Sequence, residues 1–171
     1  MYTNKVLKYF SEPKNYGQIK NPDGLGKVGN PICGDVMWLY FKLGKNKKGE
    51  EIIKDIKFET FGCVAAIATS NMIVDLAKGK TIKEALKISK EDIVKALGGL
   101  PPIKLHCSVL AVDALTEAIY DYLIHHKKPI PKELEKSHEQ IEKEKKIIKQ
   151  KYKSWITTEN KLHKKAKNKP R

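Results

Sequence analysis

The spacing of apolar residues changes at Gly62 and Cys63, and this change most constrains the fold. Before this point, short apolar and aromatic runs bounded by turn residues predict strands at 24–28, 35–43 and 52–61. After it, an alanine-rich amphipathic stretch predicts a helix over 63–78. Strands followed by helices are typical of an α+β domain. We therefore expect a small antiparallel β-sheet of about three strands packed against several α-helices.

Capping and stop signals predict the other helices. Residues that commonly precede a helix predict helix starts at Thr3 or Asn4, at Thr81 and at Ser89, and a longer helix is expected over 107–126. Pro101 and Pro102 cannot continue a helix. We therefore expect residues 100–104 to form an extended linker.

The length and the charge distribution predict one compact domain with an extension. The 171 residues suffice for one ordinary domain, which we expect to span 1–128. Prolines at 129 and 131 mark its end. The formal net charge is +14, and residues 129–171 hold 14 Lys or Arg against 6 Glu. More than half of the positive excess therefore lies in a basic, largely helical or disordered C-terminal extension.

Within this extension, apolar residues recur every seven positions, at Leu134, Ile141, Ile148 and Trp155. The positions between them are mostly polar, so the stripe is too thin for a coiled coil. We expect a solvated helix that gives way to disorder from Lys161.

The cysteine count and the lack of long apolar runs indicate in which cellular compartment the protein works. Three cysteines cannot form a fully paired disulfide framework. No run is long enough for a signal peptide or a membrane span, so we expect a cytoplasmic protein with no membrane partner. Because Arg171 is the only arginine, the charge is almost all lysine, and contact with nucleic acid would be non-specific. Nucleic acid is therefore not an expected partner.

Three cysteines lie where a backbone can present a thiol to a ligand. Cys33 lies in a loop before a strand, Cys63 at a strand-to-helix junction, and Cys107 where a helix is expected to open. The helix dipole favours thiolate at the last two positions. Asp35 and His106 add an oxygen and a nitrogen ligand beside them. Three thiolates with one such group complete a four-coordinate metal site, although the spacing itself matches no C-x-x-C motif.

Each of these residues also has an ordinary alternative. A single cysteine is often a small buried hydrophobe, and Asp35 could cap a turn. Its position two residues after Cys33 favours a ligand role, because side chains at i and i+2 of an extended chain share a side. His106 is either a surface residue or a ligand or proton carrier. The pair His125-His126 is better explained as a helix C-terminal cap than as a second metal site.

Three segments of this chain resemble the signatures of a known family. They read Gly-Asn-Pro-Ile-Cys-Gly-Asp at 29–35, Gly-Cys-Val-Ala-Ala-Ile-Ala at 62–68, and Leu-Pro-Pro-Ile-Lys-Leu-His-Cys-Ser at 100–108. In this order they are similar to the IscU/NifU-type iron–sulfur cluster assembly scaffold proteins, over roughly residues 2–127. The resemblance implies a scaffold that assembles a [2Fe–2S] cluster, with a [4Fe–4S] form as an alternative, and transfers it to recipient apoproteins. Such a protein is a carrier rather than an enzyme, although sulfurtransferase activity stays open.

The resemblance also implies ligands. Cys33, Cys63 and Cys107 would hold iron and the growing cluster, with Asp35 or His106 as the fourth ligand. Zinc would occupy the same site in the purified protein. Three strong ligands and one weaker ligand suit a site that must release its cargo, whereas four thiolates would suit storage.

The implied partners include a cysteine desulfurase, which would supply persulfide sulfur, and a frataxin-like or ferredoxin partner. The chain could also form a homo-oligomer. In the family, a Leu-Pro-Pro-Val-Lys stretch docks an Hsp70-type chaperone. Here the corresponding docking residues are Leu100, Pro101, Pro102, Ile103 and Lys104.

Two other functions compete with a scaffold. A zinc-dependent sulfur acceptor of the same fold would keep its zinc, but such relatives tend to lack the histidine before the third cysteine and to carry an insertion there. His106 is present and no insertion is evident. A basic binding module would use the lysine-rich extension to dock RNA or an acidic partner, and it could coexist with the scaffold.

Overall fold

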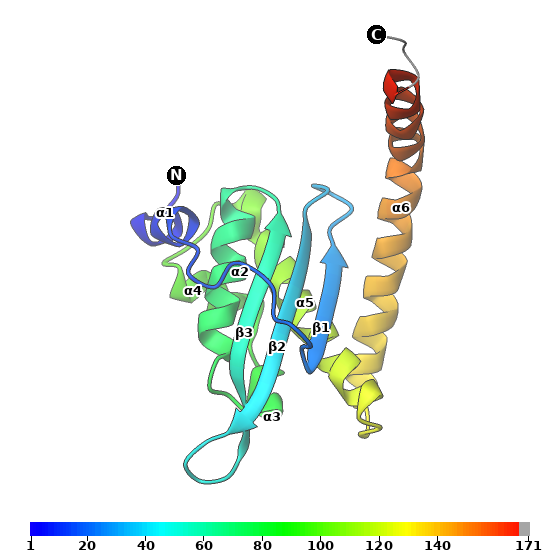
Figure 1. Ribbon diagram of the computed structural model, residues 1–171. Coiled ribbons are helices and arrows are strands. Elements are labelled where there is room, and N and C mark those ends of the chain that lie inside the picture. Colours follow the sequence, from blue (N-terminus) through cyan, green and yellow to red (C-terminus); the bar gives the residue numbers. More distant parts are fainter. Residues whose placement is uncertain (168–171) are drawn as a thin grey trace.

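The sheet is a three-stranded antiparallel meander, as predicted. In this computed structural model the backbone is described for residues 1–167, and side chains are described for 1–150 and for Lys153. The strands are β1 (Gly24–Gly29), β2 (Val36–Lys45) and β3 (Glu51–Phe61), in the order β1-β2-β3 (Figure 1). The predicted α+β fold class is confirmed.

Alternation of apolar residues directs one face of the sheet into the core. Leu39 pairs with Phe58 across β2 and β3, and both side chains are fully buried. The hairpin between them turns at Gly49, whose φ of +81° favours glycine. The Asn46 side chain accepts the backbone N–H groups of Lys48 and Glu50 and so fixes the turn.

Three of the helices, α1 (Asn4–Ser11), α3 (Ile82–Ala85) and α4 (Lys90–Ala96), begin where the capping residues predict. The other helices of the described chain are α2 (Val64–Ala77), α5 (Leu105–His125) and α6 (Lys132–Lys167). Thr3 Oγ1 accepts the Val6 N–H at 3.1 Å, and capping boxes open α3 at Thr81 and α4 at Ser89. Helices α2 and α5 cover the apolar face of the sheet (Figure 1).

The expected extended linker at 100–104 is only partly correct. Pro101 is extended, but Pro102–Lys104 form one turn of 3-10 helix, in which Lys104 N donates to Pro101 O at 2.7 Å. Proline is tolerated in a first helical turn because its missing N–H would have no partner there. This turn runs directly into α5, so α5 starts at Leu105, two residues earlier than expected.

The C-terminal extension differs from the expected solvated helix. Leu134 is 4% exposed and Ile141 is 3% exposed, and both belong to the main core, because α6 packs against α5 and β1. The helix continues to Lys167 instead of ending near Lys161, since residues 132–167 contain no proline or glycine. Residues 168–171, and the side chain of Trp155, lie outside the described part. Within the described chain, no helix combines the length and apolarity needed to cross a bilayer.

Glycines in β1 allow the backbone of α5 to lie directly on the sheet. A Cβ added to Gly26 would lie 2.1 Å from the Ala114 carbonyl oxygen and 2.7 Å from the Ala118 nitrogen. Real Cβ atoms do not approach backbone this closely, so any side chain here would push α5 away from β1. The position of α5, and of the cysteine in its first turn, therefore depends on this contact.

Replacing Gly26 with alanine tests this contact. We expect Gly26→Ala to destabilise the protein by about 3 kcal/mol, because neither backbone can move without opening the core. The neighbouring Lys27 is exposed, so Lys27→Ala should cost less than about 0.5 kcal/mol. Urea unfolding of both variants measures the difference. Equal stability of the two variants would contradict the close packing.

Candidate metal centre

Three segments bring the predicted ligands to one end of the molecule. Cys33 and Asp35 lie in the β1–β2 loop, and Cys107 lies in the first turn of α5. Cys63 is the N-cap residue of α2, separated from the end of β3 by Gly62. These segments meet at the upper end of the sheet in Figure 1. The sheet topology causes this meeting, because β1 and β3 run parallel and end on the same side.

Asp35, Cys63 and Cys107 form the centre of the site. One ligand atom from each lies within 4.8 Å of the other two. The Cys63 and Cys107 Sγ atoms are 3.8 Å apart, and both cysteines are free. A carboxylate oxygen and two sulfurs at this separation can bind the same metal ion.

Two polar atoms at this end lack a partner. Among the described residues, Asp35 Oδ2 and His106 Nε2 are the buried side-chain oxygen or nitrogen atoms that make no hydrogen bond. Such groups are rare in folded proteins because an unpaired buried polar atom destabilises the fold. Both unpaired atoms belong to predicted ligands, and a metal or cluster bound beside Cys63 and Cys107 would satisfy the Asp35 oxygen.

Cys33 and His106 are two predicted ligands that do not belong to the group formed by Asp35, Cys63 and Cys107. Cys33 is exposed, in a turn where Asn30 Oδ1 accepts the Ile32 N–H at 2.8 Å and the Cys33 N–H at 3.4 Å. Gly34 follows with φ +79°, so the segment is not extended. The extended chain assumed for Cys33 and Asp35 is therefore wrong, although the two side chains still interact, because the Asp35 carboxylate acts on the pKa of the Cys33 thiol. Asp35 also joins Cys63 and Cys107.

Burial controls the protonation of two cysteines. Burial, followed by the nearby Cys63 thiol, raises the pKa of Cys107 far above its usual range. Although Cys33 is exposed overall, partial desolvation of its thiol, together with the charge of the Asp35 carboxylate, also raises its pKa. The prediction that a helix N-terminus favours thiolate at Cys107 is wrong, because desolvation outweighs the helix dipole at a side chain that is 1% exposed.

A cation lies beside the thiols. The Cys63 thiolate is the largest influence that raises the pKa of Lys104, followed in the same direction by the Tyr2 hydroxyl. Lys104 therefore stays protonated and favours negative charge at the site.

Three further residues shape the site, and the sequence motifs did not indicate the roles of Tyr2 and Thr69. Tyr2 packs with Cys63 against the small cluster that contains Cys107. Thr69 donates its hydroxyl to the Cys107 carbonyl at 3.1 Å and so holds the first turn of α5 against α2. A Cβ on Gly62 would lie 2.9 Å from Asp35 Oδ2, so this glycine allows the carboxylate to approach.

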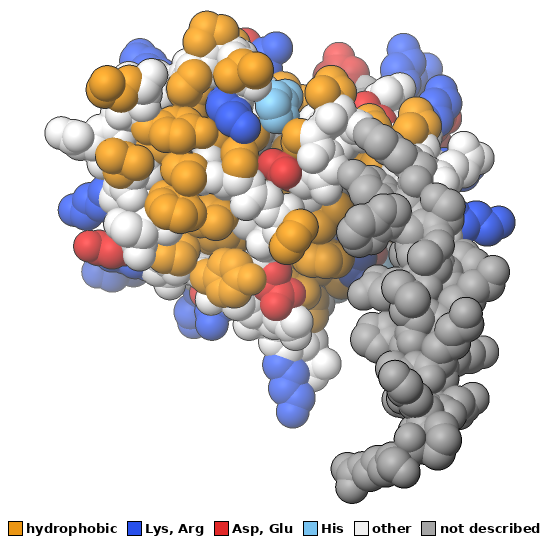
Figure 2. All heavy atoms as spheres, turned by 90° about the horizontal axis from the view of Figure 1, so that it is seen from above, with side chains coloured by type: hydrophobic (Ala, Val, Ile, Leu, Met, Phe, Trp, Pro, Cys, Tyr) orange, Lys and Arg blue, Asp and Glu red, His pale blue; other side chains and the backbone are white. Residues whose placement is uncertain are grey.

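The surface around the site is apolar. Figure 2 looks down on this end and shows hydrophobic side chains gathered on it. Large apolar side chains that are exposed here include Ile32 at 80%, Phe61 at 79% and Ile103 at 77%. All three come from the segments that carry the candidate ligands or the Pro-Pro turn. An apolar surface of this kind is suited to contact with another protein.

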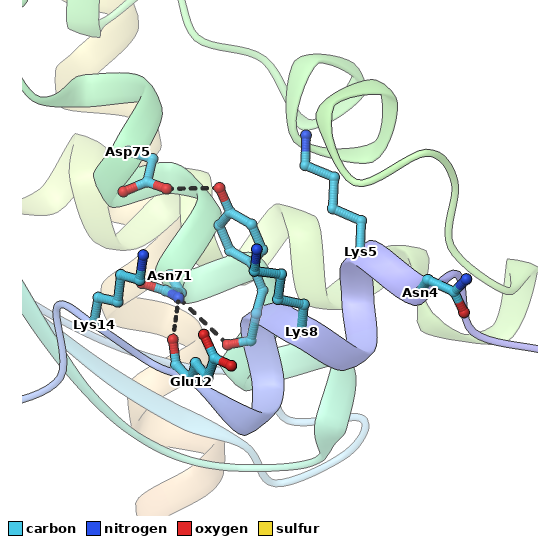
Figure 3. Close-up of a pocket in the computed structure, with 8 residues that line it drawn as sticks. Asn4, Lys5, Lys8, Glu12, Lys14, Asn71 and Asp75 are labelled. Carbon is cyan, nitrogen blue, oxygen red and sulfur yellow. Dashed lines mark hydrogen bonds between the residues drawn. The ribbon is translucent and has the colours of Figure 1, made fainter.

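A separate pocket between α1 and α2 has no cysteine or histidine among its lining residues. Its residues include lysines on α1 and Asp75 on α2 (Figure 3). Tyr9 donates its hydroxyl to Asp75 at 2.7 Å, and Asn71 Nδ2 donates to the Tyr9 carbonyl at 3.3 Å. These bonds fasten α1 to α2, so the pocket is part of the packing of the N-terminal helix.

The paired histidines at the end of α5 act as predicted. The Nδ1 atoms of His125 and His126 lie 2.8 Å from the Asp121 carbonyl oxygen and 2.9 Å from that of Tyr122. Both rings therefore bond to the last turn of the helix, which confirms the C-terminal cap.

The raised pKa values predict a pH-dependent metal affinity. Cys107 is a neutral thiol near pH 7 and must lose its proton to bind a metal, so Zn²⁺ affinity should rise with pH. Cys107→Ser should reduce the number of protons released per Zn²⁺ by about one. Calorimetric titrations in buffers of different ionisation enthalpy measure this number. Equal proton release by the two proteins would exclude Cys107 as a protonated ligand.

A family model and individual relatives both show that this chain is similar to NifU-like and IscU proteins. Over residues 1–129 the chain matches the family described as NifU-like N terminal domain. It is 57% identical over 122 residues to the iron-sulfur cluster assembly scaffold protein IscU 1 of Archaeoglobus fulgidus, covering 71% of this chain and 76% of that protein. It is 44% identical over 123 residues to the scaffold protein IscU of Aquifex aeolicus, covering 72% of this chain and 76% of the relative.

Solved structures share the fold. A protein from Fervidobacterium islandicum AW-1, described as an iron-sulfur cluster assembly scaffold protein for the SUF system, matches with a TM-score of 0.54 at 25% identity. The match covers 69% of this chain and 96% of that one. The N-terminal part of a NifU-like protein from Brucella abortus matches with a TM-score of 0.53 at 18% identity, over 70% and 92% of the two chains. At this identity, the second likeness concerns the fold alone.

Proposed function

Because this chain belongs to the IscU/NifU-type family of iron–sulfur cluster assembly scaffold proteins, we propose that it assembles an iron–sulfur cluster at this end of the sheet and transfers it to apoproteins. The observation that carries the proposal is the convergence of Asp35, Cys63 and Cys107, together with the unpaired Asp35 Oδ2. The cluster is cargo rather than a resident cofactor, and the protein acts as a carrier.

The ligand set suits a cargo that must leave. We assign Cys33, Cys63 and Cys107 as thiolate ligands, with Asp35 as the fourth ligand and His106 as its alternative. A carboxylate oxygen binds iron of a cluster more weakly than a thiolate does. The Asp35 bond is therefore expected to break first, and a [2Fe–2S] cluster is the favoured cargo. Zinc suits the same mixed set of ligands.

Sulfur must enter from a donor. We infer that a cysteine desulfurase carries it as a persulfide, and that a thiolate of this chain attacks the outer sulfur. The S–S bond of the donor breaks, and the desulfurase cysteine leaves as a thiolate. The transferred sulfur must gain two electrons to become sulfide, for which a ferredoxin-type partner is the expected source. Cys33 is the exposed thiol and is the favoured acceptor.

The Pro-Pro turn is a candidate docking site for a chaperone. Ile103 is 77% exposed in the middle of the short turn beside the candidate ligands. Contact with an Hsp70-type chaperone at 100–104 would reach the metal centre through Lys104 and the start of α5. All three thiols are free, so we place the reaction in a reducing compartment such as the cytoplasm.

Anaerobic reconstitution tests the function. We expect incubation with ferrous iron, cysteine and a desulfurase to give thiolate-to-iron absorption in the visible range. Serine at position 33, 63 or 107 should reduce that absorption by at least about tenfold, because each change removes a thiolate ligand. His125→Ala, which changes a histidine far from the site, is the control. Full cluster content in all three serine variants would refute the assignment, and stoichiometric zinc that iron and sulfide cannot displace would favour the zinc-dependent sulfur acceptor.

A fourth thiolate should retain the cargo. We expect Asp35→Cys to slow cluster transfer to an apo-ferredoxin by about tenfold, which equals roughly 1.4 kcal/mol of added barrier. Asp55→Cys adds a thiol on β3 away from the site and serves as the matched control. Circular dichroism of the acceptor follows the transfer. Equal transfer rates for the two variants would show that Asp35 is not the labile ligand.

A further inference from the structure

Helix α6 is fixed to the domain by an apolar stripe. Leu134 and Ile141, seven residues apart, are buried in the main core. The next member of the same stripe is Ile148, and α6 contacts both α5 and β1 (Figure 1). Since the stripe continues along the helix, Ile148 is directed toward the same surface of the domain.

An ionic cluster sets the position of α6 along α5. Glu117 on α5 is 7% exposed, and its carboxylate lies 2.8 Å from His138 Nδ1 and 3.5 Å from Lys145 Nζ. His138 also stacks on Tyr120, with ring centroids 3.9 Å apart. Lys145 pairs with Glu142 as well. Glu117, His138 and Glu142 have the spacing of metal ligands. Lys145 already supplies the positive charge between the two carboxylates, so the cluster serves to dock the helix.

Ile148 rests on the residue that begins the Cys33 loop. A Cβ built on Gly29 would lie 2.6 Å from Ile148 Cδ1, so the isoleucine fills the space that a side chain would take. Gly29 is the last residue of β1 and pairs with Val36 at the start of β2. The Asn30 N–H then donates to the Asp35 carbonyl at 2.9 Å and closes the loop. Ile148 therefore packs against the base of the loop that carries Cys33 and Asp35.

We propose that Ile148 of the C-terminal helix is a positioning residue for the Cys33 loop. Pressed onto Gly29, its side chain restricts the end of β1 and thereby the turn that presents Cys33. The described part of α6 is then a support for the metal centre rather than a separate tail. The inference relies on the proposed function only in treating Cys33 as a ligand.

The variant Ile148→Val removes only the Cδ1 methyl that touches Gly29. In the metal-free protein we expect hydrogen exchange of the amides at 30–35, and alkylation of Cys33, to become roughly fivefold faster, the size expected for one lost packed methyl group. Alkylation of Cys63 and Cys107 should not change. Mass spectrometry reads exchange and labelling in the same samples. Ile147 is 51% exposed, so Ile147→Val is the matched control.

A double-mutant cycle tests the contact itself. Gly29→Ala places a methyl against Ile148 Cδ1, and Ile148→Val removes that atom, so the double variant should recover part of the loop protection lost in Gly29→Ala. Additive effects would overturn the proposal. Faster exchange spread over the whole domain in Ile148→Val would also overturn it, because a merely structural role predicts that pattern. Failure of cluster assembly in the unaltered protein would refute the proposed function without changing these measurements.

Discussion

The pairing of Val36 with Phe61 is the constraint on which the metal centre depends. This pair closes the β2–β3 ladder at the end where both strands meet the loops. The residue before Val36 is Asp35, and the residues after Phe61 are Gly62 and Cys63, so the pairing brings carboxylate and thiol together. A shift of one residue would turn Asp35 to the opposite face of the sheet. The buried face of β2 and β3 prevents that shift, and the core therefore fixes the ligand geometry.

The site holds buried groups whose electrostatic cost a bound cluster would relieve. Burial keeps Cys107 neutral, while Asp35 Oδ2 and His106 Nε2 have no hydrogen-bond partner. Binding removes the thiol proton and supplies a positive centre to the unpaired atoms. Part of the binding free energy is therefore used to ionise buried groups, which limits the affinity. A limited affinity agrees with a site that gives up its cargo.

Much of the fold was predictable because it depends on local signals. Alternating apolar residues gave the strands, and capping residues gave the helix starts, including both capping boxes. The ligand residues were named from their flanking glycines and prolines and from a family resemblance. Their grouping could not be predicted, because the turn at Gly34 leaves Cys33 outside the group that Asp35 forms with Cys63 and Cys107, and because burial of Cys107 depends on how α5 packs. The stripe on α6 was visible, but the sequence did not reveal the apolar surface on α5 and β1 that covers it.

The three cysteines are held with different rigidity, and this difference sets the order in which they would bind iron. Cys63 caps α2 and Cys107 is buried in the first turn of α5, where Thr69 fixes its carbonyl. Cys33 lies instead in an exposed turn, where Asn30 Oδ1 accepts its backbone N–H. Under the proposed function, Cys63 and Cys107 would retain the first iron as rigid ligands while Cys33 meets a sulfur donor at the surface. Anything that restricts the Cys33 loop then controls when the site closes, and α6 packs against the base of that loop.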